Sequence, residues 1–109
     1  VTYSIEDIIN SQILLIVTPL KSLRSVCKML VESGIKQKST VVICAKGIEQ
    51  ETNLLPCQIA EQILKMQDLA FLSGPNFASE VALGLPSATS ISCQNEELGL
   101  DICKVLSSY

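Results

Sequence analysis

Four short blocks with the composition of β-strands recur along the chain, each followed by a segment of different periodicity. They cover residues 13–17, 41–45, 69–72 and 87–92. The first two show no polar alternation, which is typical of strands that are buried on both faces. The fourth is rich in serine and only partly alternates, so it predicts a weaker strand. The pattern indicates four strands.

Between these blocks, apolar residues recur three or four positions apart, which predicts helices. The clearest helix begins after Thr18-Pro19, with Thr18 as the expected N-cap and the proline in the first turn, and it ends at Gly34. Further helices are expected over about 55–66, 77–83 and 96–106, and a short one over 4–10 with Ser4 as its N-cap.

The alternation of strand and helix predicts an α/β fold, in which a parallel sheet has helices on both of its faces. No linker or low-complexity segment interrupts residues 1–109, so we interpret them as a single domain. The chain opens on a helix that leads into a strand, as the middle of a doubly wound domain does.

Composition narrows the classes of function. Apolar residues make up 48% of the sequence and the formal net charge is −3, so the chain can bury a core and lacks the basic surface of a nucleic-acid-binding protein. It contains no histidine, which excludes Ser-His and Cys-His catalysis within these residues. The longest apolar run, 13–17, is too short to cross a membrane, and no signal-peptide pattern opens the sequence. We therefore expect a cytoplasmic protein.

The cysteines form no C-x-x-C motif, since they stand at positions 27, 44, 57, 93 and 103. Most fall within apolar patterns, as the thiols of proteins in reducing compartments do. We expect five reduced thiols and no bound metal.

Three turns that follow predicted strands carry the candidates for chemistry: Thr18-Pro19, Lys46-Gly47, and Ser73 to Asn76. Ligands of open α/β sheets bind beyond the carboxyl ends of the strands, so we expect these turns to line one edge of the sheet. Taken singly, a lysine there is usually solvated and a Gly-Pro-Asn sequence usually forms a simple turn. The five glycines cannot be assembled into the G-x-G-x-x-G turn that binds a dinucleotide pyrophosphate.

Three runs of residues also carry a family resemblance: Val17 to Pro19 (VTP), Cys44 to Glu49 (CAKGIE) and Leu72 to Ala88 (LSGPNFASEVALGLPSA). The third run meets every fixed position of S-G-P-x-F-A-x-E-V-A-x-G-x-P-S/T-A, and it resembles the signature of bacterial glycerol-3-phosphate dehydrogenases. The similarity covers essentially the whole chain. It implies the middle-to-C-terminal part of a Rossmann-like NAD(P)-binding domain, which has a doubly wound, mainly parallel sheet with flanking helices. The family's glycine-rich loop would precede residue 1, and its catalytic lysine and helical domain would follow Tyr109.

The resemblance implies roles for five residues. Lys46 would contact both the nicotinamide end of NAD or NADP and the substrate. Gly74 and Asn76 would lie against the substrate, and Pro19 and Ala78 against the cofactor. No residue of the chain would be catalytic in itself, because Lys46 would give electrostatic support only.

The implied reaction is the reduction of dihydroxyacetone phosphate by NADH or NADPH, which gives sn-glycerol 3-phosphate for phospholipid synthesis. Lys46 would stabilise the negative charge that develops on the carbonyl oxygen. Glu49 and Glu51 nearby are interpreted as solvated loop charges. Thr18 stands where the family has the valine of an A-V-P turn.

Two other interpretations stay open. One is a different dehydrogenase of similar architecture, acting on a hydroxyacid or a sugar nucleotide. The other is a non-catalytic α/β module, such as a receiver-like domain or a degenerate gene product that only interacts. The sequence does not decide between NAD and NADP, nor whether the chain forms a homodimer.

Overall fold

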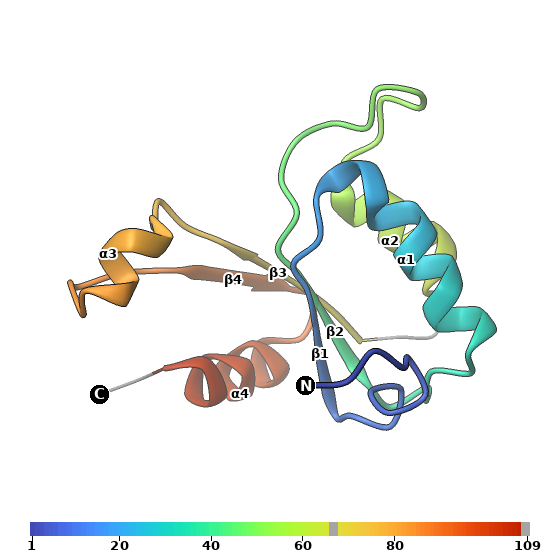
Figure 1. Cartoon of the computed structure of the whole chain (residues 1–109), viewed down its shortest axis with the longest axis horizontal. Coiled ribbons are helices and arrows are strands. Elements are labelled where there is room, and N and C mark those ends of the chain that lie inside the picture. Colours follow the sequence, from blue (N-terminus) through green and yellow to red (C-terminus); the bar gives the residue numbers. More distant parts are fainter. Residues whose placement is uncertain (66–67, 108–109) are drawn as a thin grey trace.

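The computed structural model describes residues 1–65 and 68–107, and shows one four-stranded sheet with helices on both sides (Figure 1). The strands, in sheet order, are β1 (Ile13–Ile16), β2 (Thr40–Ile43), β3 (Asp68–Ser73) and β4 (Ser90–Cys93). The helices are α1 (Leu20–Glu32), α2 (Pro56–Ile63), α3 (Ala78–Ala82) and α4 (Glu96–Leu106). Met66, which we expected at the end of the second long helix, lies outside the described residues. None of the helices in the described part of the chain is long and apolar enough to cross a membrane.

The first three strands run parallel, as predicted, with Ile13 opposite Thr40 and Thr40 opposite Asp68. The sheet is thus mainly parallel, in agreement with the expected fold class. The pattern-based prediction of a parallel sheet is wrong only for β4, which runs antiparallel to β3. The connection between them, residues 74–89, leaves β3 and returns beside the same strand end. Its helix α3 has five residues and no buried side chain, so it cannot act as a crossover helix that covers the sheet.

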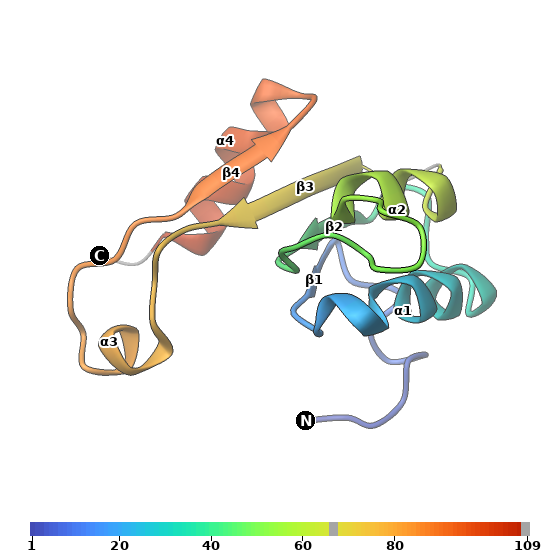
Figure 2. The same ribbon diagram turned by 90° about the horizontal axis from the view of Figure 1, so that it is seen from above.

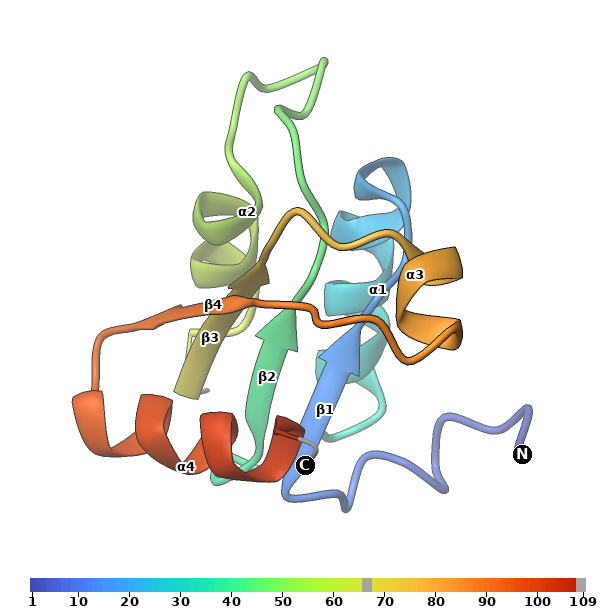
Figure 3. The ribbon, with the colours of Figure 1, turned by 90° about the vertical axis from the view of Figure 1, so that its left-hand side faces the viewer.

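Helices cover the two faces of the sheet unequally (Figures 1 and 3). Helices α1 and α2 pack on one face over a cluster of fully buried residues that includes Leu23, Val41 and Ile59. Helix α4 packs on the other face, where Ile102 meets Val42 and Ala70. This arrangement confirms the predicted α/β class with helices on both sides.

Helix α1 begins one residue later than expected. Pro19 is its N-cap, and the Pro19 carbonyl accepts the backbone N–H of Ser22 at 2.9 Å. Thr18 is therefore not the cap, and its buried hydroxyl oxygen has no hydrogen-bond partner among the described residues. At the other end, Gly34 adopts a φ of +79° and its N–H bonds the Val31 carbonyl, which ends the helix as predicted.

The helix expected over residues 4–10 is absent. The N–H groups of Ile8 and Ile9 both bond the Ile5 carbonyl, which makes a turn and not a helix. The Ser4 hydroxyl bonds the Glu6 side chain and so does not cap. A segment this short cannot offset the cost of starting a helix unless packing supports it, and Tyr3 and Ile8 are exposed.

The β3–β4 connection, residues 74–89, extends away from α1 and α2 (Figure 2). Every residue from 77 to 90 is exposed. Four of these are large and apolar: Phe77, Val81, Leu83 and Leu85. The connection thus carries α3 at its tip without burying it.

Candidate functional site

The candidate site lies where the parallel strands end. Lys46 follows the end of β2 and Gly74 follows the end of β3 directly. The ammonium Nζ of Lys46 donates a hydrogen bond to the Gly74 carbonyl oxygen at 2.9 Å. The turns after β2 and β3 therefore meet at one edge of the sheet, as the sequence predicts for Lys46 and Asn76.

The Lys46 side chain keeps donors available for a ligand. An ammonium carries three N–H donors, and one of them is used on the Gly74 carbonyl. Lys46 is exposed at this edge, and its cation is within reach of anything bound there. The contact with Gly74 fixes the direction in which the charge points.

Gly74 lies where only a residue without a side chain fits. A Cβ atom built on it would lie 2.6 Å from the Ala88 carbonyl oxygen and 3.1 Å from the Thr89 Cα. The chain of the returning connection thus passes directly over Gly74. This close approach of the backbone is sufficient to require a glycine at position 74, whether or not a ligand binds there.

Asn76 joins the two ends of the β3–β4 connection. Its side-chain amide donates to the Ala88 carbonyl at 2.8 Å and accepts from the Ala88 N–H at 3.1 Å. This pair of bonds places the start of β4 beside the end of β3, which makes the fourth strand antiparallel. One amide N–H of Asn76 is left for a ligand.

The turn after β1 is joined to the same edge through Gly47. Gly47 has a φ of +112°, and a Cβ atom there would lie 3.3 Å from the Cδ2 atom of Leu20, the residue after Pro19. The exposed Pro19 is thereby placed next to the turn of Lys46. Ala78, by contrast, begins α3 on the extended connection and is exposed away from α1 (Figure 2). At this edge of the sheet the structure thus brings together four of the five predicted residues, namely Pro19, Lys46, Gly74 and Asn76.

Glu49 is a feature that the sequence analysis interpreted wrongly. It is not a solvated loop charge: its side chain is only 13% exposed and lies 2.7 Å from the Arg24 guanidinium. Hydrogen bonds from Arg24 and Thr52 lower the pKa of the Glu49 carboxyl to about 2. No local signal reveals this pair, because its members are separated by 25 residues in the sequence.

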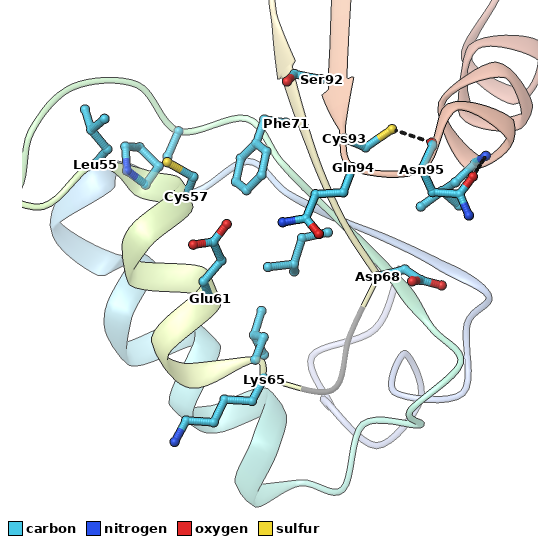
Figure 4. A pocket seen from close by; sticks show the side chains of 15 residues that line it. Leu55, Cys57, Glu61, Lys65, Asp68, Phe71, Ser92, Cys93, Gln94 and Asn95 are labelled. Atoms are coloured by element: carbon cyan, nitrogen blue, oxygen red, sulfur yellow. Dashed lines mark hydrogen bonds between the residues drawn. The ribbon is translucent and has the colours of Figure 1, made fainter.

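A groove of about 670 Å³ lies between α2 and strands β3 and β4 (Figure 4). Among the described residues that line it, the loop after β2 contributes Ala45, whereas Lys46, Gly74 and Asn76 are not part of its wall. Two thiols reach it, Cys57 and Cys93, and the Cys93 thiol is hydrogen-bonded to the Asn95 carbonyl at 2.9 Å. The groove is thus distinct from the edge where the candidate residues gather.

The five cysteines are all unpaired. Burial raises the pKa of the Cys27 thiol to about 11, which keeps it protonated and unreactive. Within residues 1–65 and 68–107, no three His, Cys, Asp or Glu side chains are grouped so that they could hold a metal ion.

Comparison with known proteins decides the family. The model of the family described as "NAD-dependent glycerol-3-phosphate dehydrogenase N-terminus" matches residues 2–99. The chain belongs to this family. This confirms the resemblance drawn from the turn residues, and it excludes a dehydrogenase of another family and a receiver-like domain.

Curated relatives agree with the family. The glycerol-3-phosphate dehydrogenase (NAD(P)+) of Wolbachia pipientis subsp. Culex pipiens (strain wPip) is 38% identical over 106 residues, which cover 97% of this chain and 33% of the relative. The protein of the same name from Wolbachia pipientis wMel is 41% identical over 99 residues, 91% of this chain and 30% of the relative. The chain thus spans about a third of the length of the curated relatives it matches.

Solved structures share the fold. The glycerol-3-phosphate dehydrogenase of Coxiella burnetii superposes with a TM-score of 0.86 at 24% identity, over 97% of this chain and 32% of the other. The enzyme of Dunaliella salina, at 22% identity, also gives a TM-score of 0.86, over 98% of this chain and 19% of the other. The Rossmann-like fold expected from the family resemblance is thereby confirmed.

Proposed function

We propose that this chain forms the nicotinamide-facing part of an NAD(P)-dependent glycerol-3-phosphate dehydrogenase. The enzyme would reduce dihydroxyacetone phosphate to sn-glycerol 3-phosphate, a precursor of phospholipids. The observation that carries the proposal is the contact of 2.9 Å between the Lys46 ammonium and the Gly74 carbonyl. It brings the family's signature turn to Lys46, which lies just beyond the end of the parallel strand β2.

The residues at this edge fit one end of a dinucleotide. Helix α1 points its N-terminus at the edge and has no side-chain cap, so free N–H groups are available there. No G-x-G-x-x-G turn occurs in the 109 residues, so this chain does not provide the usual cradle for the pyrophosphate. Pro19 and Lys46 lie at this edge and would hold the nicotinamide end, whereas Ala78 begins α3 on the extended connection and lies apart from them. Bound NADH or NADPH would supply the hydride.

Lys46 would act on the substrate by electrostatics. As the ketone is reduced, its carbonyl oxygen gains negative charge, and a cation held in place before the reaction stabilises that charge. Two N–H donors of Lys46 remain available for this oxygen, because only one is used on Gly74. Gly74 and the free amide N–H of Asn76 would flank the three-carbon phosphate.

Replacing Lys46 tests the proposal. In a full-length dehydrogenase that carries residues 1–109, Lys46→Ala should lower the turnover of dihydroxyacetone phosphate by about 10²–10³-fold, the usual cost of losing one charge-stabilising donor. NADH oxidation measures the rate. Lys28→Ala is the control, because Lys28 is an exposed residue of α1 and should be dispensable. A Lys46→Ala enzyme within a few-fold of the unmodified one would contradict the proposal.

A further inference from the structure

The loop that carries Lys46, residues 44–55, has no helix or strand of its own. We call it the Lys46 loop. It rises above the sheet between β2 and α2 (Figure 3). A backbone hydrogen bond from Cys44 N–H to the Ile16 carbonyl ties the start of this loop to the sheet, and side-chain contacts hold the part that follows Lys46.

Helix α1 contacts the Lys46 loop at two points, one turn apart. Leu20 and Arg24 are separated by four residues and so share one face of α1. Leu20 lies against Gly47, where a Cβ atom would be 3.3 Å from its Cδ2. Arg24 reaches Glu49. These two contacts lie on Gly47, the residue after Lys46, and on Glu49, three residues after it.

The contact between Arg24 and Glu49 is a forked ion pair. The Nε atom of Arg24 lies 3.0 Å from Oε1 and 3.3 Å from Oε2, and Nη2 lies 2.7 Å from Oε2. The side chains are 27% and 13% exposed. Such forked, part-buried pairs fix geometry better than a single exposed contact does.

Glu49 also organises the tip of its own loop. Its N–H bonds the Leu54 carbonyl at 2.9 Å and its carbonyl accepts the Asn53 N–H at 2.8 Å. The Thr52 hydroxyl donates to its carboxylate. The segment from Glu49 to Leu54 is thus a closed turn, and the Glu49 carboxylate is what ties this turn to α1.

We propose that Arg24 and Glu49 are positioning residues that hold the Lys46 loop against α1, so that the Lys46 ammonium stays at the Gly74 carbonyl. This inference rests on the proposed function, because it gives the two residues their effect through Lys46. Without the pair, Lys46 keeps its charge but loses its fixed direction. A displacement of about 1 Å at a reacting centre can cost about 10²-fold in rate.

The test uses Glu49→Gln, which preserves the size of the side chain and removes its charge. In a full-length dehydrogenase that carries residues 1–109, we expect kcat for dihydroxyacetone phosphate to fall about 10- to 100-fold, with a smaller change in KM. Asp101→Asn is the matched control, because it breaks the exposed ion pair of Asp101 with Lys104 on α4, far from the edge. It should leave both constants unchanged.

A double-mutant cycle separates positioning from general stability. If Glu49 acts through Lys46, adding Glu49→Gln to Lys46→Ala should lower kcat no further. Arg24→Lys provides a second variant that keeps the charge but not the fork, and it should lose less activity than Glu49→Gln. It also keeps the test decisive should Glu49→Gln fail to fold.

Two outcomes would overturn the inference. One is a kcat of Glu49→Gln within twofold of that of the unmodified enzyme. The other is a loss of kcat from Glu49→Gln that is as large in the Lys46→Ala enzyme as in the unmodified one. Failure of the proposed function would look different, because Lys46→Ala would then itself retain turnover.

Discussion

The Glu49 carboxylate is held ionised by groups from two elements. Arg24 reaches it from α1 and Thr52 from its own loop, and both lower its pKa. The hydrogen bonds to Glu49 in turn raise the pKa of Arg24, and the nearby negative charge of Glu51 adds a smaller contribution. Three residues along the chain, Lys46 has the opposite charge and a different partner, the Gly74 carbonyl. The Glu49 carboxylate and the Lys46 ammonium therefore have separate partners, Arg24 and the Gly74 carbonyl.

The stability contributed by Glu49 should depend on pH. Its folded-state pKa of about 2 lies below the ordinary value of 4.5, so the contribution is fully present above about pH 4.5 and is lost as the pH falls toward 2. We expect the difference in unfolding midpoint between the unmodified protein and Glu49→Gln to be constant at neutral pH and to shrink below pH 4.5. Thermal unfolding at pH 7, 5, 4 and 3 measures it. A difference that is unchanged at pH 3 would show that the carboxylate is not stabilised by Arg24.

At position 18, the native threonine is less favourable for stability than an apolar residue of similar size. Its hydroxyl is buried without a partner, which costs free energy, so Thr18→Val should raise the free energy of unfolding by about 1–3 kcal/mol. Denaturant unfolding measures this. Ser39→Ala is the control with the opposite sign, because the buried Ser39 hydroxyl donates to the Ser11 carbonyl at 2.8 Å. A loss of stability in Thr18→Val would mean that the hydroxyl has a partner after all.

At the scale of elements, structural features set by neighbouring residues could be predicted from the sequence, whereas features that depend on contacts between distant residues could not. The apolar blocks predicted β1 to β3 within two residues at each end, and the helix predicted over 96–106 is α4, where Asn95 is the N-cap and its side chain accepts the Leu98 N–H at 3.2 Å. The antiparallel direction of β4 follows from a connection that returns to the same end of β3, and the two hydrogen bonds between Asn76 and Ala88 that join its ends are revealed by no periodicity. The same holds for the site: strand ends located Lys46 and Gly74, whereas Glu49 required knowledge of α1 packing.

Gly74 should be essential for the pairing of β3 with β4. In Gly74→Ala, the new Cβ would lie 2.6 Å from the Ala88 carbonyl oxygen, a backbone atom that cannot move without disturbing β4. We expect a larger loss of unfolding free energy than in Gly84→Ala. Gly84 has open space around it, so its substitution carries only the strain of a φ of +71°, about 1–3 kcal/mol. Equal losses in the two variants would show that the clash is relieved without cost.

At the scale of the whole molecule, the described fold is less compact than a typical domain of its length. Its radius of gyration is 14.2 Å, whereas a compact domain of this length has about 13 Å. The extended β3–β4 connection accounts for part of this (Figure 2). Large apolar side chains are exposed in several parts of the described chain, among them Leu15 and Val17 on β1 and its end, and Phe77 and Leu83 on the connection.

Residues 1–109 alone should show no measurable reduction of dihydroxyacetone phosphate. Their sequence lacks a G-x-G-x-x-G turn for the pyrophosphate, and they span about a third of the relatives' length. Cofactor and substrate must be held together for hydride transfer, and losing that positioning removes about 7–11 kcal/mol of barrier reduction. NADH oxidation should be compared between the isolated chain and a full-length dehydrogenase that carries it, with circular dichroism confirming that the isolated chain is folded. Turnover by the folded, isolated chain would mean that the edge formed by Pro19, Lys46, Gly74 and Asn76 suffices to bind and orient both reactants.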